Sequence, residues 1–362
     1  MQKKLIALAV AAAFSAPAFA DNANFTFYGT ADLSYDMVNT GTAANGTKGT
    51  TKRVVSSNVS KFGFKGAEDL GGGLAAVWQI EQQINIDDAA KNTFASRNTF
   101  AGLKGDFGTV LLGIHDTPYK LTTRKLDVFG DSIADNRALL GGITGTSAAA
   151  AFDGRQNNVL AYISPAMSGL TAAIAAVNLT EGNKLDTDES GSALSLGLMY
   201  SAAPFYAGLG YEKHSLDHVA VGASEKATKV GFGFSQDMFS VGAVIEKTTD
   251  NLAAAQENKY GHSAVYLSGK MKVGSGAVKL AYAKAGEIGS GAAKVANSGA
   301  SMLSVGYDHK MSKQTTLYAL YSKLSNDDAA AYKFTQNSGA SSTLAGTGAS
   351  PSVVSLGMKH TF

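Results

Sequence analysis

The stretch SVVSLGMKHTF occupies residues 352–362. Apolar and polar residues alternate along it, and one side carries Val354, Leu356, Met358 and Phe362. This period of two is typical of a β-strand with one apolar face. Chain ends are usually frayed and polar, whereas this stretch ends on a bulky aromatic residue. We therefore expect a last strand that is held in place by a neighbouring strand.

The same alternation recurs along the whole chain, for example in NFTFYGTADLSYD (24–36), SALSLGLMY (192–200) and FYAGLGYE (205–212). Short turn-like links alternate with long polar stretches, as in outer-membrane barrels. The pattern predicts about sixteen strands, an even number. Their expected spans are 24–36, 53–66, 73–85, 96–104, 108–114, 156–164, 169–178, 192–201, 204–213, 227–235, 238–247, 260–270, 276–285, 300–309, 313–323 and 352–362.

The polar face of nearly every predicted strand carries Gly, Ser, Thr, Tyr and charged residues. A soluble β-sandwich or β-solenoid is the competing interpretation, but a sandwich needs a continuous apolar interior. A sixteen-stranded barrel instead has an aqueous interior and an apolar outer face. An unpaired strand edge is costly in hydrocarbon, so the last strand must close on the first. We expect an all-β, transmembrane antiparallel barrel.

Composition and charge limit the classes of fold and function that are compatible with the chain. The chain of 362 residues contains 41 glycines, 5 prolines and no cysteine, which favours a β-protein with tight turns and excludes thiol chemistry. Residues 1–20 have a short basic region, an apolar run and an Ala-Phe-Ala site, as in a cleaved secretory signal peptide. The predicted mature domain, 21–362, then has 29 basic and 29 acidic residues after Lys3 and Lys4 are removed from the 31 basic ones. Net charge thus gives no indication of a nucleic-acid partner.

Three longer motifs carry a resemblance to a known family. They are SKFGFKGAEDLGGGLAAVWQIE (60–81), RNTFAGLKGDFGTVLLGIHDTP (97–118) and RQNNVLAYISPAMSGL (155–170). In this order and spacing they resemble strands and hairpins of the general trimeric porins of β-proteobacteria, similar to those of Neisseria and Burkholderia.

The resemblance implies a sixteen-stranded barrel in the bacterial outer membrane, assembled as a homotrimer and surrounded by lipid. It implies passive diffusion of ions and small hydrophilic solutes, and a third outer loop that folds into the lumen and narrows it. It also implies that the final strand, with Phe362, is the signal read by the barrel-insertion machinery.

The sequence supports the inward loop independently. About forty residues, from Ile114 to Arg155, lack a strand pattern, and loops of this length are usually functional or disordered. Four apolar residues could anchor the loop against a wall: Leu126, Val128, Phe129 and Ile133. We expect a constriction loop at roughly 115–155, with a mobile external loop as the alternative.

Strand parity identifies candidate pore charges. If Phe62 and Phe64 face lipid, Lys61 and Lys65 face the lumen. Arg155 shares the polar side of its strand, and Arg97 is expected to point inward although its parity is ambiguous. These four residues are the predicted basic wall, and the three acidic loop residues predicted to face it are Asp127, Asp131 and Asp135. The alternative is that each is simply a solvated lumen charge.

The sequence therefore predicts a water-filled outer-membrane channel for passive diffusion with a charged constriction; a substrate-specific channel is the alternative. A barrel enzyme would need a Ser/His/Asp arrangement at a rim, and none is evident. An adhesin or autotransporter would carry a large passenger before the barrel. We expect no enzymatic activity, no cofactor, no metal site and no nucleic-acid partner.

Overall fold

The computed structural model describes residues 25–88, 92, 94–142, 152–179, 191–217, 220–252, 258–334 and 344–362. The predicted signal peptide, 1–20, lies outside these residues, as does the segment 143–151 of the predicted constriction loop. Within the described ranges, no helix is both long and apolar enough to cross a membrane.

Within the described residues the chain forms seventeen β-strands and four short helices. The strands are β1 (Thr26–Asn39), β2 (Thr51–Ser57), β3 (Lys61–Gly71), β4 (Leu74–Gln83), β5 (Thr99–Gly105), β6 (Gly108–Asp116), β7 (Arg155–Ile163), β8 (Leu170–Asn178), β9 (Gly191–Ala202), β10 (Phe205–Leu216), β11 (Ser224–Ser235), β12 (Phe239–Asp250), β13 (Ser263–Val273), β14 (Gly276–Ala285), β15 (Ala300–Lys310), β16 (Thr315–Asn326) and β17 (Ser352–Thr361). The helices are α2 (Pro118–Leu121) and the 3-10 helices η2 (Arg124–Leu126), η3 (Asn136–Ala138) and η4 (Gly291–Ala293).

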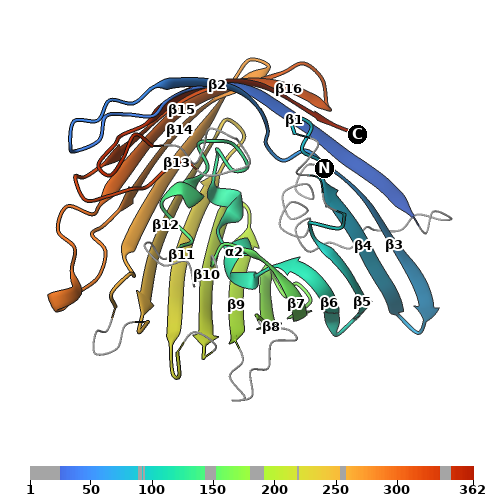
Figure 1. The fold of residues 1–362 in the computed structure, drawn as a ribbon. Helices are drawn as coiled ribbons and strands as arrows, with labels where there is room; N and C mark the ends of the chain where they lie inside the picture. Colours follow the sequence, from blue (N-terminus) through green and yellow to red (C-terminus); the bar gives the residue numbers. More distant parts are fainter. Residues whose placement is uncertain are drawn as a thin grey trace.

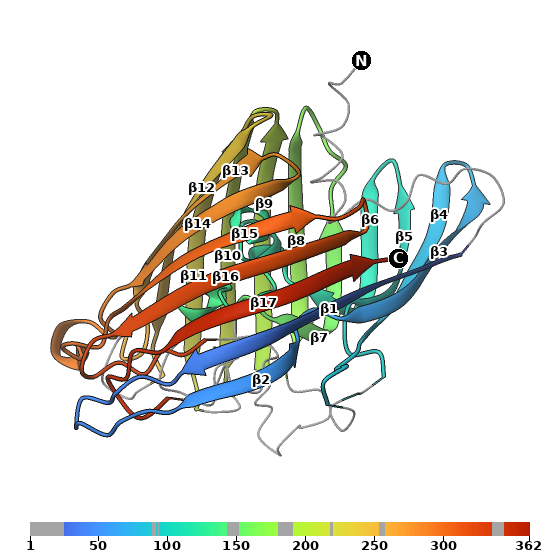
Figure 2. The ribbon, with the colours of Figure 1, turned by 90° about the horizontal axis from the view of Figure 1, so that it is seen from above.

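The strands form one closed antiparallel barrel. From β3 to β17 each strand pairs with the next, and β17 returns to pair with β1 (Figure 1). The view from above shows β17, β1 and β2 lying side by side (Figure 2). Strands β2 and β3 both pair with β1, one after the other, so they are two halves of a single barrel strand. The seventeen strand segments thus make sixteen barrel strands, as the alternation predicted.

The predicted continuous strand 53–66 is wrong at its centre, because the ladder is interrupted between Ser57 and Lys61. Here the Asn58 N–H donates to the Asp32 carbonyl (2.9 Å), and the Asp32 N–H donates to the Ser60 hydroxyl (2.9 Å). The Ser60 hydroxyl therefore accepts a hydrogen bond that a backbone carbonyl would accept in a regular ladder. Such local side chain–backbone bonds compete with sheet pairing.

The two faces of the wall have opposite chemistry. In β9, Leu194, Leu196 and Leu198 are exposed on the outside, and they alternate with buried residues on the inside. In β1 the inward positions carry polar side chains, such as Asp32 and Ser34. The apolar outer face and polar inner face confirm that the polarity of the barrel is reversed relative to that of a soluble protein.

Backbone and side-chain contacts of Phe362 close the barrel at its seam. Gly29 and Phe362 exchange two backbone hydrogen bonds, of 2.9 and 3.0 Å. The Phe362 ring covers Gly29 and lies 5.8 Å from the Phe27 ring, measured between centroids. A Cβ atom at position 29 would overlap this ring.

This contact predicts that Gly29→Leu weakens the seam, because the Phe362 ring must leave its place over β1. Overpacking of this kind costs about 1–3 kcal/mol. We expect a lower unfolding temperature of the purified barrel, measured by the temperature at which its heat-modifiable band disappears in gel electrophoresis. Ala31→Leu, on the same face of β1, is the matched control. Equal unfolding temperatures for the two variants would contradict the proposed contact.

Candidate functional site: the constriction of the lumen

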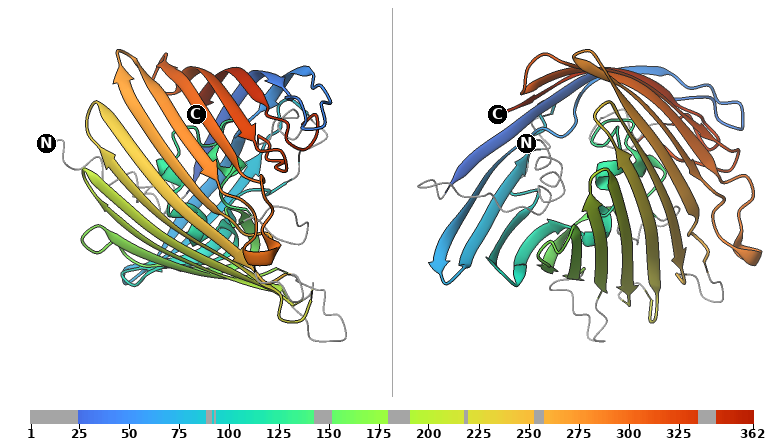
Figure 3. Two further views of the ribbon diagram at one scale, coloured as in Figure 1. Left: turned by 90° about the vertical axis from the view of Figure 1, so that its left-hand side faces the viewer. Right: turned by 180° about the vertical axis from the view of Figure 1, so that it is seen from behind.

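The segment after β6 turns into the barrel and lies against its inner wall. Helices α2 and η2 sit inside the ring, next to β9–β12 (Figure 1), and the view from behind shows the same placement (Figure 3). Helix α2 is capped by Thr117, whose hydroxyl accepts a hydrogen bond from the Lys120 N–H (3.3 Å). The expected inward-folded loop is therefore confirmed, and the mobile external alternative is wrong for the described part of the loop.

Inward-facing glycines of the wall make room for this loop. A Cβ atom at Gly231 or Gly233 would lie 2.7 or 2.8 Å from a methyl carbon of Leu126. A Cβ at Gly208 would overlap the carbonyl of Thr122. Since real Cβ atoms do not approach this closely, side chains at these positions would hold the loop away from the wall. The glycines therefore allow the loop to lie directly on the backbone of β10 and β11 and leave the rest of the lumen open.

Apolar residues of the loop complete the packing. Leu126, Phe129 and Ile133 are almost fully buried, and Val128 packs against the same cluster. The anchor residues predicted from sequence are therefore confirmed. Their burial fixes the position of the loop relative to the strands on one half of the barrel.

Three tyrosines connect loop and wall through hydrogen bonds. The Tyr119 hydroxyl donates to Glu246 of β12 (2.6 Å), and the Tyr206 hydroxyl donates to the Thr122 carbonyl (2.5 Å). The Tyr266 hydroxyl donates to Asp127 (2.6 Å). These buried bonds lie on three different strands. The loop can move only if several of them break together.

The acidic loop residues are paired within the loop itself. Arg124 donates to Asp131 (2.8 Å) and to Asp135 (2.6 Å), and Arg137 donates to Asp135 (both contacts 3.0 Å). Asp127 and Asp135 are buried, whereas the side chain of Asp131 is 41% exposed. Of the three predicted acidic residues, Asp131 alone presents an exposed carboxylate to the lumen.

The pKa values of the two buried carboxyl groups are shifted in opposite directions. Burial, together with repulsion from Asp135, raises the pKa of Asp127 to about 6. Burial also disfavours ionisation of Asp135, but Arg124 and Arg137 outweigh it and hold the pKa of Asp135 far below its usual range. The loop therefore changes its charge near pH 6 through Asp127 while Asp135 stays ionised.

The predicted basic wall lies across the lumen: Lys61 and Lys65 belong to β3, Arg97 precedes β5, and Arg155 begins β7. Lys61, Arg97 and Arg155 each form an ion pair with a carboxylate. Lys61 and Arg97 share Glu81, with ion-pair distances of 3.0 and 2.6 Å. The ambiguous parity of Arg97 is thereby resolved, because Glu81 is opposite the inward-facing Gly63. Lys65 lies 5.2 Å from the centre of the Tyr28 ring.

Arg155 lies near the start of the loop and belongs to a second ion-pair group. It contacts Asp116 (3.2 Å) and donates to Asn98 (2.7 Å). Lys120 of helix α2 approaches the same carboxylate (2.8 Å). Each group has two cations and one carboxylate, so each keeps one positive charge.

Sequence reasoning missed several of these charged residues. Glu81, Asp116 and Lys120 complete the wall groups, and Arg124 and Arg137 neutralise the acidic loop. Strand parity could have identified Glu81, which alternates with the outward-facing Ile80. The pairing partners inside the loop had no sequence signal, because they depend on how an irregular segment folds.

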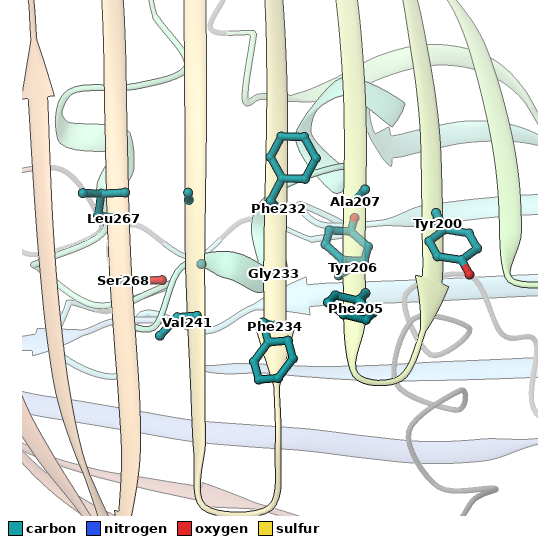
Figure 4. Close-up of a pocket in the computed structure, with 12 residues that line it drawn as sticks. Tyr200, Phe205, Tyr206, Ala207, Phe232, Gly233, Phe234, Val241, Leu267 and Ser268 are labelled. Atoms are coloured by element: carbon teal, nitrogen blue, oxygen red, sulfur yellow. The ribbon is translucent and has the colours of Figure 1, made fainter.

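One hollow of the described structure does not lie on the solute path. It has a volume of 530 Å³, and large apolar side chains such as Phe205, Phe232, Val241 and Leu267 border it (Figure 4). These four side chains are all exposed on the outer face of β10–β13. The hollow is therefore a depression in the lipid-facing surface.

Comparisons with known proteins agree with this geometry. The sequence pattern of the family described as Gram-negative porin matches residues 7–329. The chain belongs to the Gram-negative porin family. Among related porins, outer membrane porin protein 32 of Delftia acidovorans is 28% identical over the full length of both chains. The major outer membrane protein P.IB of Neisseria lactamica is 28% identical and covers 87% of this chain and 91% of its own.

Solved porin structures share the fold. An anion-selective porin from Comamonas acidovorans has a TM-score of 0.77 at 24% identity, covering 93% of this chain and 99% of its own. OmpF of Salmonella typhi, in complex with daunomycin, has a TM-score of 0.68 at 16% identity, covering 93% and 97%. This porin is therefore a channel of the bacterial outer membrane, through which ions and small hydrophilic solutes diffuse passively. Its relatives are channels rather than enzymes.

The glycine contacts predict the effect of Gly208→Val on the pore. The added side chain would overlap the Thr122 carbonyl, so the loop should move toward the lumen and lower the single-channel conductance. Gly269→Val is the control, because a Cβ at Gly269 meets no atom within 4 Å. An unchanged conductance in a correctly folded Gly208→Val porin would refute the role of the glycines.

Acidification is predicted to shift ion selectivity toward anions between pH 7 and pH 5. In the folded porin Asp127 takes up a proton in this range, whereas an unfolded Asp titrates near 3.9. Because the folded state binds the proton more tightly, the loop also gains stability as pH falls through this window. The measurement is the reversal potential in a salt gradient at several pH values. Asp127→Asn should remove most of the shift; an identical shift in this variant would contradict the assignment.

Proposed function

We propose that the constriction gives this porin a modest preference for anions, set by the basic wall Lys61, Lys65, Arg97 and Arg155. The observation that carries the proposal is the balance of charge across the lumen. With Lys120, the wall has five cations against the two carboxylates Glu81 and Asp116, a difference of three positive charges.

The facing loop adds little charge of its own. Arg124, Lys125 and Arg137 oppose Asp127, Asp131 and Asp135, which leaves no net charge when all three carboxyl groups are ionised and one positive charge when Asp127 is protonated. The constriction is then positive on one side and nearly neutral on the other. Rings of charge of one sign favour counter-ions in a pore.

The preference is expected to be modest because the wall is partly neutralised. Glu81 and Asp116 each offset one of two adjacent cations, and lumen water screens the remainder. The Comamonas porin named above is described as anion-selective, which agrees with the sign. At 24% identity that likeness concerns the fold alone, so the charge balance of this chain is what supports the proposal.

The assembly and processing of the chain belong to the same proposal. We expect a homotrimer with no catalytic activity, a signal peptide at 1–20, and a mature domain at 21–362 with a constriction loop at roughly 115–155. One OmpT structure of Vibrio cholerae with a TM-score of 0.66 is described as a trimer form. Phe362 is expected to serve as the signal read by the insertion machinery, in addition to its place in the seam.

Planar-bilayer recording tests this proposal. A trimer should insert in steps of three conductance units, and the reversal potential should indicate a mild anion preference. Lys61→Glu combined with Arg155→Glu replaces two positive charges with negative ones, so the reversal potential should move toward cation selectivity. Lys323→Glu, on the outer face of β16, is the control and should leave it unchanged. An unaltered reversal potential in the double variant would reject the assigned wall.

A further inference from the structure

Three neighbouring strands carry a glutamate–lysine pair near the end where the long loops are attached. These pairs are Glu212-Lys213 in β10, Glu225-Lys226 in β11 and Glu246-Lys247 in β12. Successive side chains of a strand point to opposite faces. The glutamates are buried on the inner face, and the lysines lie on the outer face, where Lys226 and Lys247 are exposed. At this level the barrel wall therefore carries negative charges on its inner face and positive charges on its outer face.

The inner glutamates are already engaged with other groups. Glu212 and Glu225 contact the two ring nitrogens of His214, at 2.9 and 2.5 Å. Glu246 accepts hydrogen bonds from the Tyr119 hydroxyl (2.6 Å) and from the Gly141 N–H (2.7 Å). These carboxylates hold the constriction loop and the inner wall, so they do not pair with the outer lysines.

The outer lysines lie close to one another. Lys213 is directly opposite Lys226 in the ladder, which places their Cβ atoms about 4.5–5.5 Å apart. Lys247 is opposite Thr228, one diagonal step from Lys226, at about 7–8 Å. Like charges directly opposite each other destabilise a sheet. The three lysines together thus form a surface that favours an anionic partner.

The described surroundings of the lysines offer no such partner. The residues opposite them on the flanking strands are Leu194 and Ser263. At the rim, Asp217 accepts from the Gly222 N–H, and Asp250 accepts from the N–H groups of residues 259–261. Both carboxylates order loops. Among the described residues, none of the three lysines forms an ion pair.

The position of the lysines on the barrel shows which region of the membrane they face. Tyr211 lies two residues below Lys213 on the outer face, and the same step occurs as Tyr282 and Lys284 in β14. Outward tyrosines mark the membrane interface of a barrel. Two further residues add about 7 Å along a strand. This places the lysines at the level of the lipid headgroups, in the leaflet on the side of the long loops.

We propose that Lys213, Lys226 and Lys247 bind the phosphorylated headgroup of a lipid in the outer leaflet. Phosphate is the anionic group that lies at this depth in a membrane, and ammonium groups bind it as point charges. The exposed outer side chains of Leu209 and Ile245 lie below the lysines and would contact the acyl chains. A soluble phosphate ion would lack this apolar contact.

Lipid retention measured by native mass spectrometry tests the proposal on the full-length folded protein. The probes are lipid A, which is a phosphorylated glycolipid, and its fully dephosphorylated form. The test variant is Lys213→Gln/Lys226→Gln/Lys247→Gln. The control is Lys272→Gln/Lys310→Gln/Lys313→Gln, which removes three exposed charges at the opposite end of the barrel. The unfolding temperature and conductance of each variant establish that it is folded.

We expect the wild type and the control to bind lipid A at least tenfold more tightly than the dephosphorylated lipid. The test variant should lose this difference. In bilayers of phosphatidylcholine alone, it should unfold at the same temperature as the wild type or higher, because the repulsion between lysines is gone. Equal retention of lipid A by the test variant, or equal retention of the two lipids by the wild type, would overturn the proposal. So would displacement of bound lipid A by millimolar inorganic phosphate, since the site would then be one for soluble anions.

Discussion

The structure depends on one constraint: every backbone N–H and C=O group that faces hydrocarbon must find a partner within the protein. A sheet satisfies this only if it closes. Here closure is made by β17 against β1, and the last backbone pair, between Gly29 and Phe362, extends the ladder to its end. The bulky side chain of Phe362 is part of this seam, where its ring lies beside the Phe27 ring.

Closure of sixteen strands has a second consequence. The ring is too wide for wall side chains to fill, so water occupies its centre and a separate segment must narrow it. In this porin that segment is the loop after β6. Its position is determined by glycines that bring it close to the wall and by the buried tyrosine hydrogen bonds to Glu246, Thr122 and Asp127. The width of the pore therefore depends on contacts between the loop and the wall.

The wall separates charge as well as polarity. Near the loop-bearing end of β10–β12, carboxylates point inward, where Glu246 holds the constriction loop, while lysines point outward toward the membrane. Inside the lumen, cations share carboxylates, as Lys61 and Arg97 share Glu81. This sharing allows a narrow pore to contain many charges without an excessive field of one sign. In the function proposed above, the few charges that remain unbalanced set the ion preference.

Residue alternation alone was enough to predict most of the strands, the inversion of the barrel and the inward parity of Lys61 and Arg155. The reason is that a period of two records which face is wet, residue by residue. The sequence also identified the anchors Leu126, Phe129 and Ile133, since apolar residues in a long loop need a surface to pack on.

Three features could be seen only in the folded barrel: the break between β2 and β3, the pairing of Asp135 with Arg124 and Arg137, and the sharing of Asp116 by Arg155 and Lys120. Such contacts join residues whose sequence spacing has no period. Their partners become neighbours only when the barrel closes and the loop finds its place inside it.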